Sequence, residues 1–230
     1  MKSIADLLFA PARFFAAMEG KEHSLKIPAL IAVTGALVSA LAAYATMSGL
    51  YAGMFAASGA GAGMGMFMGL VGAVSAFIAF IVLWWVIMAG AFYVVSILFK
   101  GSGTFSSTLA VTGYGLVPTI IGTALSAISS LYYLPRITVP IVRNIQDPAV
   151  IQNAIRDLMQ DPAMQEYSIV SLAFSVLFLV WSANIWIFGV KHARKLDTRN
   201  ACITVLVPVG IMILYLLITF FASGLSMGGS

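Results

Sequence analysis

The residues that could do chemistry in this sequence are few. The most suggestive are the glycines and hydroxyls of GSGTFSSTLAVTGYGLVP, residues 101–118. Closely spaced glycines followed by hydroxyls are typical of loops that wrap a phosphate. A dinucleotide-binding loop needs a third glycine at a fixed spacing between a strand and a helix, and a Walker loop needs Gly-Lys followed by Ser or Thr. Neither pattern is complete, so the sequence does not predict a nucleotide site.

Other reactive side chains are isolated. His23 and His192 stand among basic residues at the ends of apolar stretches, with no second ligand at a spacing that suits a metal ion. Cys202 is the one cysteine, so no disulfide can form within the chain, and no base lies near it inside an apolar stretch. We therefore expect no catalytic residue, no metal site, no cofactor and no nucleic-acid partner.

The elements that position these residues belong in a membrane. The sequence is 61% hydrophobic and 9% charged, with a mean hydropathy of +1.01. Its charge-free runs far exceed about 20 residues, more than a soluble core buries, and they suit helices that cross a bilayer. The predicted class is an all-α polytopic membrane protein, and we expect it in the cell membrane.

Charged residues mark the ends of five predicted spans. From Ile27 to Phe99 the chain carries no charge, a length that suits two helices joined by the glycine-rich residues 48–66. The spans form a membrane domain at residues 27–224 and lie near 28–48, 68–98, 108–132, 168–190 and 201–223. The second is long enough that we expect it to tilt or to protrude from the hydrocarbon.

Basic residues divide unequally between the two sides that five spans define. One side holds nine: Lys2, Arg13, Lys21, Lys26, Lys100, Lys191, Arg194, Lys195 and Arg199. The other holds three: Arg136, Arg143 and Arg156. Because Lys and Arg near span ends resist translocation, we expect a cytoplasmic amino terminus and an extracytoplasmic carboxyl terminus. The candidate contacts for anionic lipid or for an unknown protein partner are Lys191, Arg194, Lys195 and Arg199.

The first 26 residues form a cytoplasmic segment with an amphipathic pattern. Ser3 and Asp6 resemble a weak capping box, and Pro11 divides the segment into two short helices. Apolar side chains that fall largely on one face are Ile4, Leu7, Leu8, Phe14, Phe15 and Met18. We expect an interfacial helix on the cytoplasmic leaflet, and a signal remnant or a partner-binding helix is the alternative.

The extracytoplasmic connection, residues 134–167, contains two Asp-Pro pairs. Each aspartate suits a helix cap and each proline a first helical residue, so we expect one helix from Asp147 to near Asp161 and a second, shorter helix after it. The apolar face of the first helix, with Ile151 and Leu158, would pack on the membrane surface or across the mouth of the bundle. A lid over a binding site is the alternative.

Polar groups inside the predicted spans are sparse. No Asp, Glu, Lys, Arg or His lies within them, which disfavours proton-coupled transport. Asn184, between Trp181 and Trp186, is the amide at depth in the fourth span, and it suits either hydrogen bonding between helices or a polar cavity. Pro118 and Pro208 should kink the third and fifth spans.

Glycines indicate close helix contacts, either within one bundle or in a homo-oligomer. Small residues recur every four positions at Gly35, Ser39 and Ala43, and again at Gly65 and Gly69. Gly113 and Gly115 flank Tyr114, so we expect Tyr114 inside the bundle with its hydroxyl bonded to another span. A headgroup anchor at the cytoplasmic interface is the alternative for Tyr114.

Several of these motifs resemble the Yip domain family, integral membrane proteins named for interaction with Ypt/Rab GTPases. The residues that carry the resemblance are Gly101, Gly103, Thr104 and Phe105 in a glycine-rich turn, followed by Tyr114, Gly115 and Pro118. The opening APARFFAAMEGKEHSLKIPALIAVTGALVSAL, residues 10–41, is similar to that of short prokaryotic members. The resemblance implies five membrane helices, a cytoplasmic amino terminus and a role in organising membranes or recruiting partners.

Two functions from different classes follow. The first is a non-enzymatic scaffold of the Yip type that organises membranes or recruits protein or lipid partners. The alternative is a small permease, channel or lipid-handling protein with a weakly polar cavity in the bundle. The candidate packing or cavity residues are Gly113, Tyr114, Gly115, Pro118 and Asn184. A continuous polar path between the leaflets favours the second function, and a dry bundle favours the first.

Overall fold

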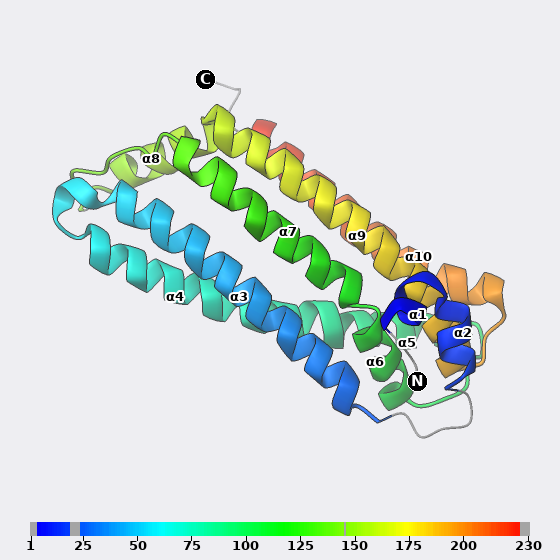
Figure 1. Ribbon diagram of the computed structural model, residues 1–230. Helices are drawn as coiled ribbons and strands as arrows, with labels where there is room; N and C mark the ends of the chain where they lie inside the picture. The colour runs from blue at the N-terminus through cyan, green and yellow to red at the C-terminus, as the bar shows by residue number, and fades with distance from the viewer. Residues whose placement is uncertain (1–3, 19–23, 145, 226–230) are drawn as a thin grey trace.

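Long helices run side by side in a bundle (Figure 1). The computed structural model describes residues 4–18, 24–144 and 146–225. Five helical segments in this part of the chain are long and apolar enough to cross a membrane: Lys26–Met54, Gly61–Leu98, Phe105–Arg136, Pro162–Arg194 and Thr198–Ala222. The predicted all-α class and the predicted number of spans are confirmed.

The connection between the first two spans is much shorter than predicted. Helix α3, Lys26–Met54, and helix α4, Gly61–Ala79, leave only a short link with the 3-10 turn η1, Ala56–Ser58, between them. The predicted linker at 48–66 was wrong because its glycines build a helix contact. A Cβ atom on Gly61 or Gly65 would lie 2.7 Å from a backbone oxygen of α3, so glycine lets the two helices approach closely.

The second span contains a stretch of π-helix that the sequence does not predict. This segment, η2, Phe80–Ile87, lies between α4 and helix α5, Met88–Leu98. The Trp85 indole in η2 donates from Nε1 to the Leu109 carbonyl at 2.9 Å. The wider turn is thus tied to the third span by a side-chain hydrogen bond.

The third span is interrupted rather than kinked. Helix α6, Phe105–Tyr114, ends before helix α7, Val117–Tyr133, begins, and the turn η3, Leu134–Arg136, follows. The predicted kink at Pro118 is therefore a complete break. Proline has no N–H for the carbonyl four residues earlier, and it suits the first turn of a new helix. Six of the 10 residues of α6 are buried, because α6 packs among α3, α5 and α9 at the end of the bundle that carries α1 and α2 (Figure 1).

The connection between the third and fourth spans contains one helix where two are predicted. Helix α8, Pro148–Gln160, begins at Asp147, whose carboxylate accepts from the Ala149 N–H at 2.9 Å. Asp161 also caps a helix, as predicted, but that helix is the fourth span itself, α9, Pro162–Arg194. The predicted short second helix was wrong because its turns run without a break into the apolar stretch.

Helix α8 lies across the mouth of the bundle, near the link between α3 and α4 (Figure 1). Its buried Ala154 and Leu158 share a small hydrophobic core with Leu50 and Met54 of α3. The Val142 N–H donates to the Met54 carbonyl at 2.8 Å, which ties the connection to the end of α3. Of the two predicted placements, packing across the bundle mouth is the observed one.

The predicted amino-terminal helices are present, and their apolar face meets the bundle itself. Helices α1, Ile4–Phe9, and α2, Pro11–Ala16, pack beside α9 (Figure 1), whereas Ser3 lies outside the described residues. Phe14 and Phe15 are buried in the main hydrophobic core. The segment is therefore part of the folded domain.

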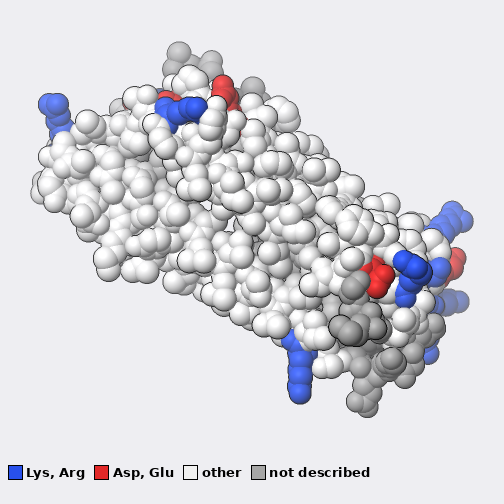
Figure 2. All heavy atoms as spheres, in the orientation of Figure 1, with Lys and Arg blue, Asp and Glu red and all other residues white. Residues whose placement is uncertain are grey.

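Charged side chains lie at the two ends of the bundle, with an uncharged band between them (Figure 2). Lys and Arg gather at the end that carries α1 and α2, where α9 ends and helix α10, Thr198–Leu225, begins. The end near α8 carries both signs. This distribution is the one expected of a chain that crosses a bilayer.

Candidate functional site

The glycine turn between the second and third spans holds an arginine side chain. Arg194, the last residue of α9, is 2% exposed. Its Nε donates to the Ser96 hydroxyl at 2.8 Å, and its two terminal nitrogens donate to the carbonyls of Gly101, at 2.8 Å, and Gly103. The guanidinium carbon lies 4.3 Å from the centroid of the Tyr93 ring, a cation–π contact. The stretch that suggests a phosphate loop therefore presents carbonyl oxygens to a cation.

Both glycines let the backbone of this turn reach the end of α9. Gly103 has φ +118°, a conformation that favours glycine, and a Cβ atom there would collide with the Ala193 carbonyl oxygen. A Cβ atom on Gly101 would lie 2.9 Å from a backbone oxygen of α5. The Ser102 N–H donates to the Arg194 carbonyl at 2.9 Å. The glycine turn therefore accepts hydrogen bonds from the Arg194 side chain and also donates one to the Arg194 carbonyl.

Burial removes Arg194 from the predicted contacts for lipid or partner. A guanidinium with three acceptors in the chain and a ring beside it has no free face for a headgroup. Lys195 and Arg199 are exposed, and Lys191 is half-buried with its ammonium group donating to the Thr198 hydroxyl at 2.9 Å. Three of the four predicted cations therefore remain accessible.

Gly113 and Gly115 lie at close contacts around the end of α6. A Cβ atom on Gly113 would lie 2.7 Å from the Pro28 Cβ, and one on Gly115 would overlap the Trp186 indole. That indole donates from Nε1 to the Thr112 carbonyl at 2.8 Å. The third span thus meets both the first and the fourth spans here.

Tyr114 lies inside the bundle and is 7% exposed. Its ring packs edge-on against the rings of Phe14 and Phe15, with centroids 5.4 Å and 6.3 Å away. The predicted hydrogen bond from its hydroxyl to another span is not found within the described part of the chain. These aromatic contacts position Tyr114, and they pack the amino-terminal segment against the bundle.

Asn184 faces outward instead of bonding another span of the bundle. It is exposed and lines a groove between α9 and α10, beside Gly210. No hydrogen bond to its amide is found among the described residues. The predicted link between helices comes from the buried Ser182, whose hydroxyl lies 2.9 Å from that of Thr119 on α7.

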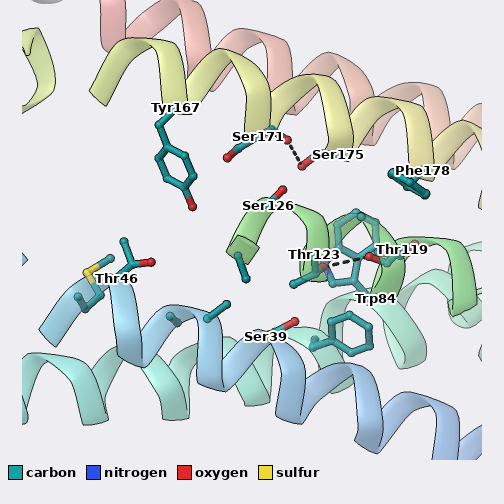
Figure 3. A pocket seen from close by; sticks show the side chains of 16 residues that line it. Ser39, Thr46, Trp84, Thr119, Thr123, Ser126, Tyr167, Ser171, Ser175 and Phe178 are labelled. Atoms are coloured by element: carbon teal, nitrogen blue, oxygen red, sulfur yellow. Dashed lines mark hydrogen bonds between the residues drawn. The ribbon is translucent and has the colours of Figure 1, made fainter. Parts of the chain in front are cut away.

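A cavity of about 390 Å³ lies between α3, α7 and α9 (Figure 3). Its hydroxyl-bearing lining residues are Ser39, Thr46, Thr119, Thr123, Ser126, Tyr167, Ser171 and Ser175. Aromatic rings of Phe80, Trp84 and Phe178 complete much of the wall. Neither Tyr114 nor Asn184 lines this cavity, so it differs from the cavity that the sequence predicts.

Comparison with known proteins identifies the family. The Yip1 domain matches residues 5–220, from the amino-terminal helices to the last span. The chain belongs to the Yip1 domain family. This Yip1 domain protein is also similar to an uncharacterized protein of Methanocaldococcus jannaschii, with 36% identity over 138 residues, which are 60% of this chain and 94% of the relative. No solved structure matches the chain.

Membership confirms the resemblance drawn from the glycine turn and from the Tyr-Gly and proline positions that follow it. Together with the five apolar spans, it establishes a multi-pass integral membrane protein. Within this Yip1 domain the turn at residues 101–103 binds Arg194 of the same chain. That part of the motif is therefore structural.

Proposed function

We propose that this Yip1 domain protein is a non-enzymatic membrane scaffold that gathers anionic lipid or a protein partner at its basic end. The observation that carries the proposal is the exposure of Lys195 and Arg199, with the half-buried Lys191 beside them, at the turn from α9 to α10. Further exposed cations at this end are Arg13, Lys26 and Lys100. Arg13 lies on α2 itself, Lys26 begins α3, and Lys100 follows the end of α5.

Acidic residues do not cancel this charge. The described carboxylates at the basic end are Asp6, whose Oδ1 lies 3.7 Å from Arg13, and Asp197, which accepts from the Asn200 N–H at the start of α10. The opposite end has Arg136, Arg143 and Arg156 against Asp147, Asp157, Asp161 and Glu166. Among the described residues, positive charge therefore predominates at the basic end only.

The same asymmetry supports the orientation that we propose. The basic end, with the amino terminus, faces the cytoplasm, and the carboxyl terminus lies outside. The cytoplasmic leaflet is the one rich in anionic lipid, and each Lys or Arg near its surface contributes about 1 kcal/mol of attraction. Three accessible cations around the turn from α9 to α10 would then favour anionic lipid over neutral lipid.

Support for a non-enzymatic role comes from where the reactive side chains lie. Charged residues of the described spans are confined to the span ends. In the residues that the structure describes, no group of three His, Cys, Asp or Glu side chains is placed to hold a metal ion. Away from the charged span ends, the described spans carry hydroxyl groups, indoles, the Asn184 amide and the Cys202 thiol.

The test is the quantity of anionic lipid that copurifies with the protein. In the triple variant Lys191→Gln, Lys195→Gln and Arg199→Gln, we expect bound anionic lipid to fall by several fold, with a larger fall at low salt, where electrostatic attraction is least screened. The matched control replaces Arg136, Arg143 and Arg156 by Gln at the other end. Equal lipid retention by parent and triple variant, in salt-free buffer, would leave the three cations as orientation signals only.

A further inference from the structure

We propose that the cavity between α3, α7 and α9 binds a membrane lipid with an uncharged, hydroxyl-bearing head, of the diacylglycerol class. The site lies in the apolar part of the bundle and shares no residue with the basic end. It therefore adds a function to the scaffold role, and the two proposals can be tested independently.

The uncharged lining of the cavity limits which head groups can bind there. The wall is formed by residues of α3, η2, α7 and α9, and none of them carries a charged side chain. Bringing an ionised phosphate or ammonium group into such surroundings is unfavourable unless a partner charge compensates. The lining offers no such partner, so it selects an uncharged head.

Two hydroxyl groups in the cavity wall donate their hydrogen bonds within their own helices. The Thr123 hydroxyl donates to the Thr119 carbonyl at 3.0 Å, and the Ser175 hydroxyl donates to the Ser171 carbonyl at 2.8 Å. These protons are used within the helices, while the hydroxyl oxygens keep lone pairs that can accept. A ligand that brings its own O–H donors, as a free glycerol hydroxyl does, complements such a wall.

Ser171 on α9 also indicates a ligand in the cavity. Its hydroxyl oxygen is buried and has no hydrogen-bond partner within the described structure. A buried hydroxyl without a hydrogen-bond partner destabilises a structure, so the position of Ser171 against the cavity needs an explanation. In Figure 3, Ser171 and Ser126 face the same space from α9 and α7. The oxygen itself has almost no accessible surface, so a rotation of the Ser171 side chain toward the cavity would bring it to a hydroxyl head bound between these two helices.

Apolar lining explains why the occupant is a lipid rather than a free polyol. Phe80, Trp84 and Phe178 join Ala43 and Met47 in the wall, and these side chains suit an acyl chain better than water. A volume of about 390 Å³ falls in the range of ordinary ligand pockets, about 300–1,000 Å³. Several lining side chains are only half-buried, so a lipid can enter from the bilayer.

The experiment is a lipid titration of the purified full-length protein in detergent, followed by native mass spectrometry. The probes are 1,2-dioleoylglycerol, dioleoylphosphatidylglycerol, which has the same chains and an anionic head, and glycerol, which has hydroxyls without chains. We expect a specific complex with dioleoylglycerol at concentrations where neither of the other two forms one in the cavity.

Cavity variants assign the binding to this place. Ala127→Phe fills the cavity from α7, and we expect it to weaken dioleoylglycerol binding by at least about tenfold, equivalent to about 1.4 kcal/mol. Ala45→Phe is the matched control, because Ala45 is exposed on the same bundle and does not line the cavity. Ser171→Ala tests the hydroxyl without adding bulk, and it serves if Ala127→Phe does not fold.

Each outcome decides the proposal. Loss of dioleoylglycerol binding in Ala127→Phe or Ser171→Ala, with Ala45→Phe like the parent, supports it. Unchanged binding in both cavity variants overturns it, as does equal cavity binding of dioleoylphosphatidylglycerol or of glycerol. The triple variant of Lys191, Lys195 and Arg199 should bind dioleoylglycerol like the parent, so failure of the scaffold proposal is seen separately.

Discussion

Arg194 and Ser96 lie 98 positions apart in the sequence and meet through a 2.8 Å hydrogen bond from the arginine Nε to the serine hydroxyl. The Ser96 hydroxyl in turn donates to the Tyr93 carbonyl at 2.6 Å. Arg194 and Ser96 are both buried. The ends of α5 and α9 and the glycine turn therefore form one hydrogen-bonded cluster, which positions the exposed cations beside it.

Loss of this arginine should destabilise the fold. In Arg194→Gln the Ser96 hydroxyl and two turn carbonyls lose their charged donor, so we expect the free energy of unfolding to fall by roughly 3 kcal/mol. Arg194→Lys should not restore the parent value, because one ammonium group cannot replace a planar guanidinium that bonds three separate acceptors. The measurement is the thermal midpoint in detergent.

The control for Arg194 is a nearby arginine that is exposed. Arg199→Gln removes the same charge five positions later, and we expect a thermal midpoint close to that of the parent, since exposed charges contribute little to stability. Equal midpoints for Arg194→Gln and Arg199→Gln would contradict the structural role of Arg194.

Gly103 should not tolerate a side chain. Gly103→Ala places a Cβ atom at φ +118° against the Ala193 carbonyl oxygen, and we expect a loss of about 1–3 kcal/mol. Gly90→Ala is the matched control, because Gly90 lies in α5 with open space around it and alanine favours a helix. A thermal midpoint for Gly103→Ala as high as that for Gly90→Ala would show that the turn does not need glycine.

Gly113→Leu should separate the first and third spans. A Cβ atom there already lies 2.7 Å from the Pro28 Cβ, so a leucine forces overpacking that costs about 1–3 kcal/mol or more. Gly210→Leu on α10 adds the same bulk where nothing lies within 4 Å. We expect Gly113→Leu to lose monodisperse protein in detergent and Gly210→Leu to keep it. Monodisperse Gly113→Leu together with aggregated Gly210→Leu would refute close packing at Gly113.

The spans could be predicted from the sequence because long apolar runs without a charged residue can be read directly from it. The helical structure of most of residues 48–66 could not be predicted in this way. Glycine is typical both of loops and of close helix contacts, and only the position of the partner helix distinguishes the two. The charge count treats Arg194 and Arg199 alike. Their different burial depends on Ser96 and the glycine turn, which are distant from both residues in the sequence.

The cavity had a signal that sequence analysis missed. Thr119, Thr123 and Ser126 follow helical spacing on α7, and Ser171 and Ser175 do so on α9. The spacing of these residues indicates one hydroxyl-bearing face on each helix, but the sequence does not show that the two faces lie opposite each other. The outward direction of Asn184 was equally hidden, because one amide in an apolar helix marks no face.

Asp161 should make the corner between α8 and α9 sensitive to acid. Partial desolvation raises the pKa of its carboxyl, but hydrogen bonds from the N–H groups of Thr138, Met164 and Ala163 together outweigh this, and the pKa lies below the ordinary 3.8. The stabilisation is therefore present above the ordinary pKa and is lost as the pH falls through the lowered one.

Comparison with Asp161→Asn measures this effect. The asparagine can still cap α9 but does not titrate, so we expect the thermal midpoint of the parent to fall more steeply than that of the variant between about pH 5 and pH 2. Parallel profiles for parent and variant would mean that the Asp161 carboxylate contributes nothing specific to the corner.

Orientation in the membrane tests the central claim most directly, because the basic end can gather cytoplasmic lipid or partners only if it faces the cytoplasm. In a Cys202→Ser background, single cysteines replace Ala12, exposed on α2, and Gln165, exposed at the start of α9. A membrane-impermeant maleimide is then applied to intact cells that express each variant. The account predicts labelling of Gln165→Cys in intact cells and of Ala12→Cys only after permeabilisation. Labelling of Ala12→Cys in intact cells, with Gln165→Cys protected, would contradict it.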